Sequence, residues 1–131
     1  MTESTDPLIE FLLEETSDTL QVVVHHETDS WDFLYVHDAV RESIDEWETS
    51  FDELMEQFRT DAETNRQREE VFDAGSFHCS LHLFEGVLII HFSRASGEGI
   101  LFGYDPDAAP NLTSFVDLCS PHIHRRLNAD F

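Results

Sequence analysis

The chain contains no lysine, and its seven cationic side chains other than histidine are all arginine. They stand against 28 aspartate and glutamate residues, which gives a formal net charge of −21. Such an excess of charge repels itself at low ionic strength and is screened in about molar salt, where the Debye length is about 3 Å. The sequence therefore predicts a protein adapted to the salt-rich cytoplasm of a halophilic organism.

No apolar run approaches the ~18 residues that a membrane-spanning helix requires. The amino-terminal residues, MTESTDPLIE, contain neither the basic nor the apolar segment of a signal peptide. We therefore expect a cytoplasmic protein without membrane insertion. The two cysteines, Cys79 and Cys119, are then expected to stay reduced and to pack as small apolar groups. The strongly anionic surface also argues against nucleic acid as a partner.

Catalytic signatures are missing as well. The chain contains no nucleophile elbow, no phosphate-binding loop, no paired CxxC and no metalloprotease helix motif. With 28 acidic residues in the sequence, pairs of carboxylates suited to acid–base chemistry arise by chance almost anywhere. The sequence therefore predicts no catalytic residue and no cofactor, and it favours a protein that is not an enzyme.

The chain does contain enough apolar material for a single folded domain over residues 1–131. Apolar residues make up 40% of the sequence, and 11 residues are phenylalanine. A disordered acidic chain lacks this capacity for burial. The length is sufficient for one hydrophobic core and short for two.

Residues 77–92, FHCSLHLFEGVLIIHF, combine two apolar runs with the turn-forming pair Glu85-Gly86, which is typical of an antiparallel hairpin. If this pair forms the turn, Phe84 faces Val87 and the rest of the register follows. Because side chains alternate between the two faces of a strand, one face of the hairpin is wholly apolar and must be covered. That face holds Cys79, Leu81, Leu83, Leu88, Ile90 and Phe92.

The opposite face of this hairpin carries three histidines, His78, His82 and His91. In the expected register, His91 lies diagonal to the other two at ~7–8 Å, which is within reach of long side chains. Imidazoles that converge with a carboxylate would suit zinc or a similar metal. Positions four apart on a strand are about 13 Å apart, so a pair forms more easily than the full set. The alternatives are histidines hydrogen-bonded beneath a helix, and a polar patch that meets a partner or a small ligand.

The remaining histidine pairs give weaker signals. Adjacent residues of a strand point to opposite faces, so His25 and His26 cannot share one metal ion simply. His122 and His124 lie near the terminus, where solvated side chains are the rule.

Apolar periodicity outlines the other elements of the chain. We expect helices from Pro7 to about Ser17, from Asp38 and from Leu112, and strands at 20–26, 31–37, 77–84, 87–92 and 99–104. The polar residues 59–70 either extend the long helix into solvent or form a loop. Pro121 is expected to stop or kink the last helix. Beyond it, residues 121–131 either form a loose tail or continue the apolar side of the helix in a final turn through Ile123 and Leu127. The order α-β-β-α-β-β-β-α predicts an α/β (α+β) fold, with a five-stranded antiparallel sheet and helices on its faces.

The long helix carries a wide stripe of large apolar side chains spaced by three and four residues, namely Trp47, Phe51, Met55 and Phe58. Such a stripe can exceed what one face of a sheet covers, so these residues are candidates for an interaction surface. The alternative is that the whole stripe is core. Further along the helix, Arg59 and Arg66 share a face that is expected to be solvated.

The element order resembles that of roadblock and longin domains, and more loosely that of profilin-like and sensory PAS-type sheets. The resemblance covers nearly the whole chain and rests on element order without a diagnostic motif. Roadblock-like proteins commonly dimerise through the long middle helix and the strand after it, and serve as platforms or regulators for small GTPases. The resemblance therefore implies a dimer surface at residues 38–69 and 77–84, and a small GTPase or signalling protein as a further partner.

A second resemblance concerns the runs WDFLYVHDAV (31–40) and FHCSLHLFEGVLIIHF (77–92). They are similar to segments of a family of small acidic proteins of halophilic archaea to which no activity is assigned. In that family, Arg is expected where this chain has His37. The resemblance implies the habitat and the domain boundaries.

These features together predict a non-catalytic intracellular interaction or regulatory module that forms a homodimer. A second hypothesis is a sensory domain that holds a ligand or a metal on the face of His78, His82 and His91. A third hypothesis is a metal-dependent enzyme, in which His91 would be required for activity.

Overall fold

The computed structural model of the chain describes residues 6–94, 96–108 and 111–127. Its elements are α1 (Pro7–Glu15), β1 (Val22–His26), β2 (Trp31–Val36), the 3-10 helix η1 (Asp38–Ser43), α2 (Ile44–Gln67), α3 (Glu69–Phe72), β3 (Cys79–Leu83), β4 (Leu88–Ser93), β5 (Gly99–Tyr104), the 3-10 helix η2 (Pro106–Ala108) and α4 (Leu112–Leu127). Apart from the short α3, η1 and η2, this is the order that the sequence predicts.

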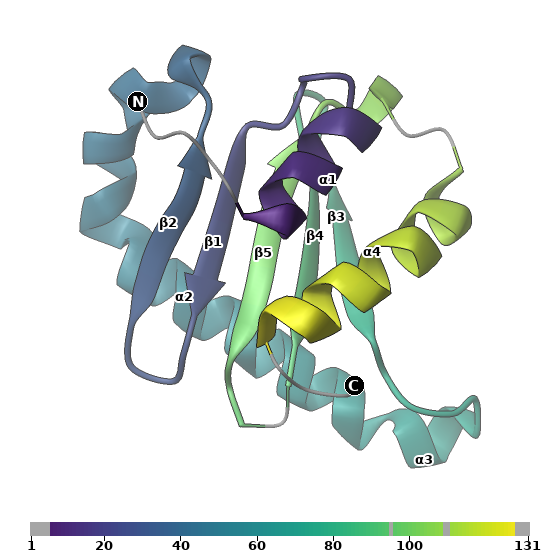
Figure 1. Ribbon diagram of the computed structural model, residues 1–131. Coiled ribbons are helices and arrows are strands. Elements are labelled where there is room, and N and C mark those ends of the chain that lie inside the picture. The colour runs from purple at the N-terminus through teal and green to yellow at the C-terminus, as the bar shows by residue number, and fades with distance from the viewer. Residues whose placement is uncertain (1–5, 95, 109–110, 128–131) are drawn as a thin grey trace.

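The strands form one sheet in the order β2-β1-β5-β4-β3, and every neighbouring pair is antiparallel (Figure 1). β1 and β2 form one hairpin and β3 and β4 form the other. β5 joins the two hairpins, because it pairs with β4 on one side and with β1 on the other. The predicted five-stranded antiparallel sheet is confirmed, and β2 and β3 are its two edges.

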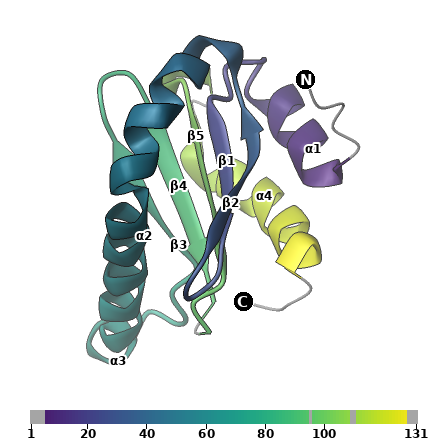
Figure 2. The ribbon, with the colours of Figure 1, turned by 90° about the vertical axis from the view of Figure 1, so that its left-hand side faces the viewer.

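Helices cover both faces of this sheet, which gives a three-layer arrangement (Figure 2). α2 lies along one face, and α1 and α4 lie together against the other. We refer to these as the α2 face and the α1/α4 face. Because successive side chains of a strand point in opposite directions, each strand supplies residues to both layers.

The larger hydrophobic core lies on the α1/α4 face. It joins Leu12 of α1 and Ile123 of α4 to Phe92, Phe102 and Tyr104 of the central strands, all of them almost completely buried. Burial of such a side chain contributes about 1.5–3 kcal/mol. A smaller core on the α2 face consists of Val22, Val24, Phe51, Met55, Phe58 and Leu101. The two cores together fix the sheet between its helices.

The amino-terminal helix begins as its sequence predicts. The Asp6 carboxylate caps α1 by accepting a hydrogen bond from the backbone N–H of Leu8 at 2.9 Å, and Pro7 occupies the first helical position. Proline suits this position because its missing N–H would have no partner within the helix.

The long helix starts later and ends later than its apolar stripe. The segment expected to open the helix at Asp38 forms η1 instead, and α2 proper begins at Ile44. At the other end, the polar stretch 59–70 continues as helix through Gln67 and leads into α3. Ala62 is buried against the sheet and Arg66 binds the end of β4, so this part of the helix is held by contacts that the apolar pattern does not reveal.

The last helix runs through Pro121 to Leu127, which is the alternative in which Ile123 and Leu127 continue its apolar side, and a loose tail from residue 121 is not formed. Ile123 and Leu127 are buried in the larger core, and this burial outweighs the backbone hydrogen bond that proline cannot donate. Residues 128–131 of the expected tail lie outside the part of the chain that the structure describes.

Candidate functional site

The hairpin of β3 and β4 has the register that its turn predicts. Cys79 lies opposite Phe92 and Ser80 lies opposite His91. Next to the turn, the backbone N–H of Phe84 donates to the carbonyl oxygen of Val87 at 2.9 Å. The histidine face of the hairpin is the α2 face of the sheet, because Phe58 of α2 contacts His82 and His91.

Two of the three candidate histidines, His82 and His91, lie beside one aromatic side chain of α2. The Phe58 ring makes edge contacts with both imidazoles, at centroid distances of 5.1 Å to His82 and 5.2 Å to His91. His82 Nε2 makes its hydrogen bond with Ser80 Oγ at 3.1 Å, while His78 is exposed before β3 begins. The structure therefore does not bring His78, His82 and His91 to one point. Among the described residues, no group of three or more His, Cys, Asp or Glu side chains is arranged to hold a metal ion.

His91 instead pairs with a histidine from the other half of the sheet. His91 Nε2 lies 2.8 Å from His26 Nε2, and both side chains are buried. One imidazole must donate its N–H to the other, so this contact requires at least one neutral ring. His26 Nδ1 has no hydrogen-bond partner among the described residues.

Gly99 of β5 makes this pairing possible. His26 lies opposite Gly99 on β1, and Ser93 lies opposite Gly99 on β4. A Cβ atom at position 99 would lie 2.7 Å from His26 Nε2 and would collide with the carbonyl oxygen of Phe92. The His26 ring therefore crosses β5 over Gly99, where no side chain stands in its way. A glycine inside a strand often marks a place where another group approaches the backbone closely. Gly99 is therefore the sequence feature that could have indicated the contact between His26 and His91.

Burial keeps both histidines neutral. Desolvation is the main cause that lowers the pKa of His26 to about 4, and the positive charge of Arg59 acts in the same direction. Desolvation likewise lowers the pKa of His91 to about 3, with further contributions from His26, His82, Arg66 and Arg59. The pair is thus a neutral, buried hydrogen-bonded contact at pH 7.

The apolar face of the hairpin is only half covered. Leu88, Ile90 and Phe92 of β4 are buried, as expected. On β3, however, Leu81 is 39% exposed and Leu83 is 72% exposed, so the expectation that this whole face is covered is wrong for the edge strand. β3 lies outside β4 at the border of the sheet, where no further strand flanks it.

The apolar stripe of α2 faces inward where the structure describes it. Phe51, Met55 and Phe58 are buried against the sheet, in the core of the α2 face. The side chain of Trp47 lies outside the described part of the chain. The aromatic contacts of Phe51 are with Trp31 and Phe33 of β2, at centroid distances of 4.5 and 5.3 Å. The alternative that the stripe is core fits these three placements.

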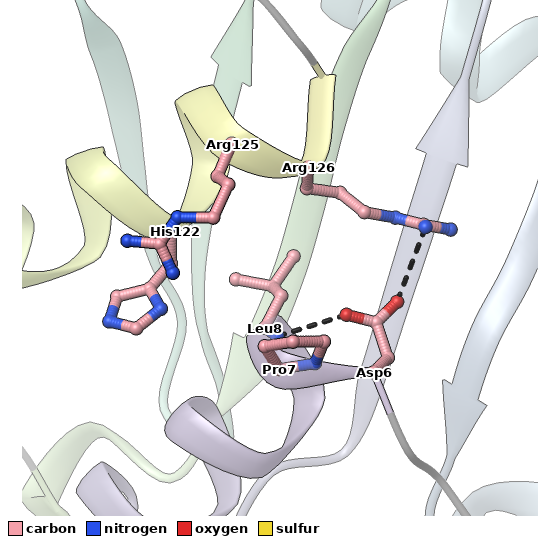
Figure 3. Close-up of a pocket in the computed structure, with 6 residues that line it drawn as sticks. All are labelled: Asp6, Pro7, Leu8, His122, Arg125 and Arg126. Atoms are coloured by element: carbon pink, nitrogen blue, oxygen red, sulfur yellow. Dashed lines mark hydrogen bonds and ion pairs between the residues drawn. The ribbon is translucent and has the colours of Figure 1, made fainter.

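A hollow of about 390 Å³ lies where the start of α1 meets the end of α4 (Figure 3). Asp6 Oδ2 lies 3.4 Å from Arg126 Nη1, and the same carboxylate caps α1. Arg125 turns toward His122 and away from Asp6. The His122 ring stacks on Phe11 at a centroid distance of 4.0 Å. These contacts tie the two helices of this layer together.

Both cysteines are free thiols in the structure. Cys119 is fully buried, while Cys79 is only partly buried on β3. Burial raises the pKa of the Cys79 thiol to about 11 and raises that of Cys119 further. The thiolate forms that bind metals or attack substrates are therefore disfavoured.

Comparison with known proteins places the chain within one family. A family profile whose description reads "Domain of unknown function (DUF7522)" matches residues 6–124. A search of curated proteins found no match.

Within the described ranges, no helix is long and apolar enough to cross a membrane.

Proposed function

The chain belongs to this family of unknown function, and on that premise we propose that it is a non-catalytic interaction module that forms a homodimer through the edge strand β3. The observation that carries the proposal is an uncharged, partly apolar sheet edge on a protein with a net charge of −21. Natural sheet edges are usually blunted by charged residues, proline or bulges, which prevents pairing with another strand. None of these devices is present in the sequence 77–84, FHCSLHLF.

The backbone and side chains of β3 both support this contact. Phe84 donates toward β4, and hydrogen-bonded and non-bonded pairs alternate along an antiparallel ladder. The N–H and C=O groups of Leu81 and Leu83 therefore point to the open edge. Leu83 and Phe84 are also exposed, at 72% and 58%, so a strand added here would bury apolar side chains as well as backbone groups.

A second copy of the chain is the occupant that charge favours. Most of the surface carries carboxylates, and a second copy would be repelled there. Two β3 strands can pair antiparallel about a two-fold axis without setting like charges opposite each other. The roadblock-like element order implies dimerisation through residues 38–69 and 77–84, which includes the same strand. By that resemblance, the dimer would serve as a platform or regulator for a protein such as a small GTPase in a halophilic cytoplasm.

Light scattering during gel filtration in about 2 M KCl tests the proposal, because screening then removes most of the repulsion. We expect twice the 15.1 kDa mass of one chain. Leu83→Lys places a charge on the edge, and Leu81→Pro removes an N–H that points away from β4. Each variant should weaken dimerisation by about tenfold or more, which is typical of a residue central to an interface.

Leu118→Lys is the matched control. It makes the same chemical change at a leucine of α4 that is 52% exposed, and it leaves the strand edge untouched. The control should dimerise like the wild type. A wild-type protein that stays monomeric over a wide concentration range, or a control that dissociates as readily as Leu83→Lys, would refute the proposal.

The histidine face carries no second proposal. α2 covers this face, His91 pairs with His26, and His82 bonds to Ser80 beside Phe58, while His78 is exposed before β3 begins (Figure 2). A ligand that reached His82 and His91 would first have to displace the long helix, because Phe58 of α2 lies against both rings.

A further inference from the structure

A polar hollow of about 590 Å³ lies on the α2 face, between the second half of α2 and the turns that follow β1 and β4. It is lined by Thr28, Asp29, Glu56, Arg59, Thr60, Glu63, Thr64, Arg66, Gln67, Ser93, Arg94, Ser96 and Gly97. Its volume is within the range of about 300–1,000 Å³ that small-molecule sites occupy. The hollow is separate from the β3 edge and from the hollow of Figure 3.

Arginine is concentrated here to an unusual degree. Three of the seven arginines of the chain, Arg59, Arg66 and Arg94, line this hollow, together with three of its 28 acidic residues. Acidic residues outnumber arginines by 28 to 7 in the whole chain, whereas the two kinds are equal in number here. The hollow is therefore a local exception to the charge of the molecule.

Two of these arginines, Arg59 and Arg66, donate hydrogen bonds to uncharged carbonyl and hydroxyl oxygens. Arg66 Nη2 donates to the carbonyl oxygen of Ser93 and, at 2.8 Å, to Ser93 Oγ. Arg59 Nη1 donates to the carbonyl oxygen of Glu27 at 3.3 Å. Within the described part of the chain, neither guanidinium forms an ion pair with a carboxylate. Arg94 differs, because its Nη1 lies 2.9 Å from Glu98 Oε1.

These contacts position the two guanidinium groups without pairing either of them with a carboxylate. Each group has five N–H donors, and the contacts above engage a single nitrogen in each. Arg59 and Arg66 are seven residues apart on α2, so they project from the same side of the helix, two turns apart. Hydroxyl groups of Thr60, Thr64 and Ser96 add further donors around the hollow.

We propose that this hollow binds a small oxyanion ligand, of which a phosphorylated metabolite is the class that fits best. A guanidinium fork matches phosphate and carboxylate oxygens in pairs, and two such forks with surrounding hydroxyls suit a group that has several oxygens. The acidic residues of the lining, Asp29, Glu56 and Glu63, are exposed and would repel an anion. The anionic group of the ligand is therefore expected to meet Arg59 and Arg66, which are half-buried, and its uncharged part to lie near these carboxylates.

Calorimetric titration with inorganic pyrophosphate tests the site, with KCl fixed at one concentration for all proteins. We expect saturable binding of one pyrophosphate per chain, with a Kd below about 1 mM. Arg59→Gln and Arg66→Gln should each weaken binding by about tenfold or more, because each removes charge-assisted hydrogen bonds. Arg59→Lys keeps the charge and loses the fork, so it should fall between the wild type and Arg59→Gln.

Arg68→Gln is the matched control, since Arg68 follows α2 and does not line the hollow. Its affinity should equal that of the wild type, and circular dichroism in the same buffer verifies that every variant is folded. Citrate binding with the same dependence on Arg59 and Arg66 would support the oxyanion site and assign it to polycarboxylates. The absence of saturable binding, or equal losses in Arg68→Gln and Arg59→Gln, would overturn the proposal.

Discussion

At the scale of single residues, the unexpected feature is the buried pair of His26 and His91. The sequence singles out His91 but not its partner, because the two meet only when β5 is placed between β1 and β4. Alternation along the strands predicts which face each histidine occupies. It does not predict which strands are neighbours, so the pair could not be derived from the register of either hairpin alone.

The pair makes stability depend on pH. Both folded-state pKa values, about 4 for His26 and about 3 for His91, lie below the ordinary value of 6.5. Their contribution to stability is therefore fully present above about pH 6.5 and is lost as the pH falls toward those lower values. His91→Gln removes one of the two titrating groups. Urea midpoints of the variant should decline less between pH 7 and pH 4 than those of the wild type.

The acidic residues also titrate in this range, and the variant shares them with the wild type, so the difference between the two curves isolates the histidine. His78→Gln makes the same change at an exposed position and should follow the wild-type curve. Parallel curves for His91→Gln and the wild type would contradict the assignment of acid sensitivity to this pair.

At the scale of elements, local patterns predict most of what the structure contains. The turn at Glu85-Gly86 sets the β3–β4 register, and the change from alternating to helical periodicity after Asp38 locates the long helix. Elements stabilised by distant contacts were less predictable. α4 continues past Pro121 because Ile123 is buried in the core, and α2 continues past Phe58 because Ala62 and Arg66 meet the sheet. The exposure of β3 likewise depends on strand order, which no local pattern fixes.

Strand β5 illustrates the importance of a position that has no side chain. Gly99→Ala would place a Cβ against the backbone of β4 and the His26 ring, and a backbone oxygen cannot rotate away as a side chain can. We expect a loss of about 1–3 kcal/mol in the free energy of unfolding, the usual range for overpacking. Gly86→Ala is the control, because no atom lies within 4 Å of its added Cβ, and it should change stability by less than about 0.5 kcal/mol. Urea denaturation in one buffer compares them, and equal losses would show that Gly99 is not sterically required.

At the scale of the whole molecule, some of the few arginines connect separate elements. Arg126 joins α4 to Asp6 at the start of α1, and Arg66 joins α2 to the end of β4. Elsewhere the surface is dominated by carboxylates. Arg126 and Arg66 thus connect separate elements, and Arg66 also belongs to the proposed ligand site beside α2.

The same charge distribution predicts that folding depends on salt. An exposed pair of opposite charges contributes about 0.2–1 kcal/mol to stability, and neighbouring like charges destabilise by similar amounts. With 28 acidic residues and only seven arginines, unscreened repulsion should therefore destabilise the fold by several kcal/mol. The Debye length falls from about 10 Å at 0.1 M salt to about 3 Å at 1 M, and the urea midpoint should rise steeply over this interval. Sucrose, which is excluded from protein surfaces but does not screen charge, serves as the control and should stabilise the protein far less below 0.1 M salt. A circular dichroism spectrum that stays unchanged after complete desalting would mean that self-repulsion is too weak to govern this fold.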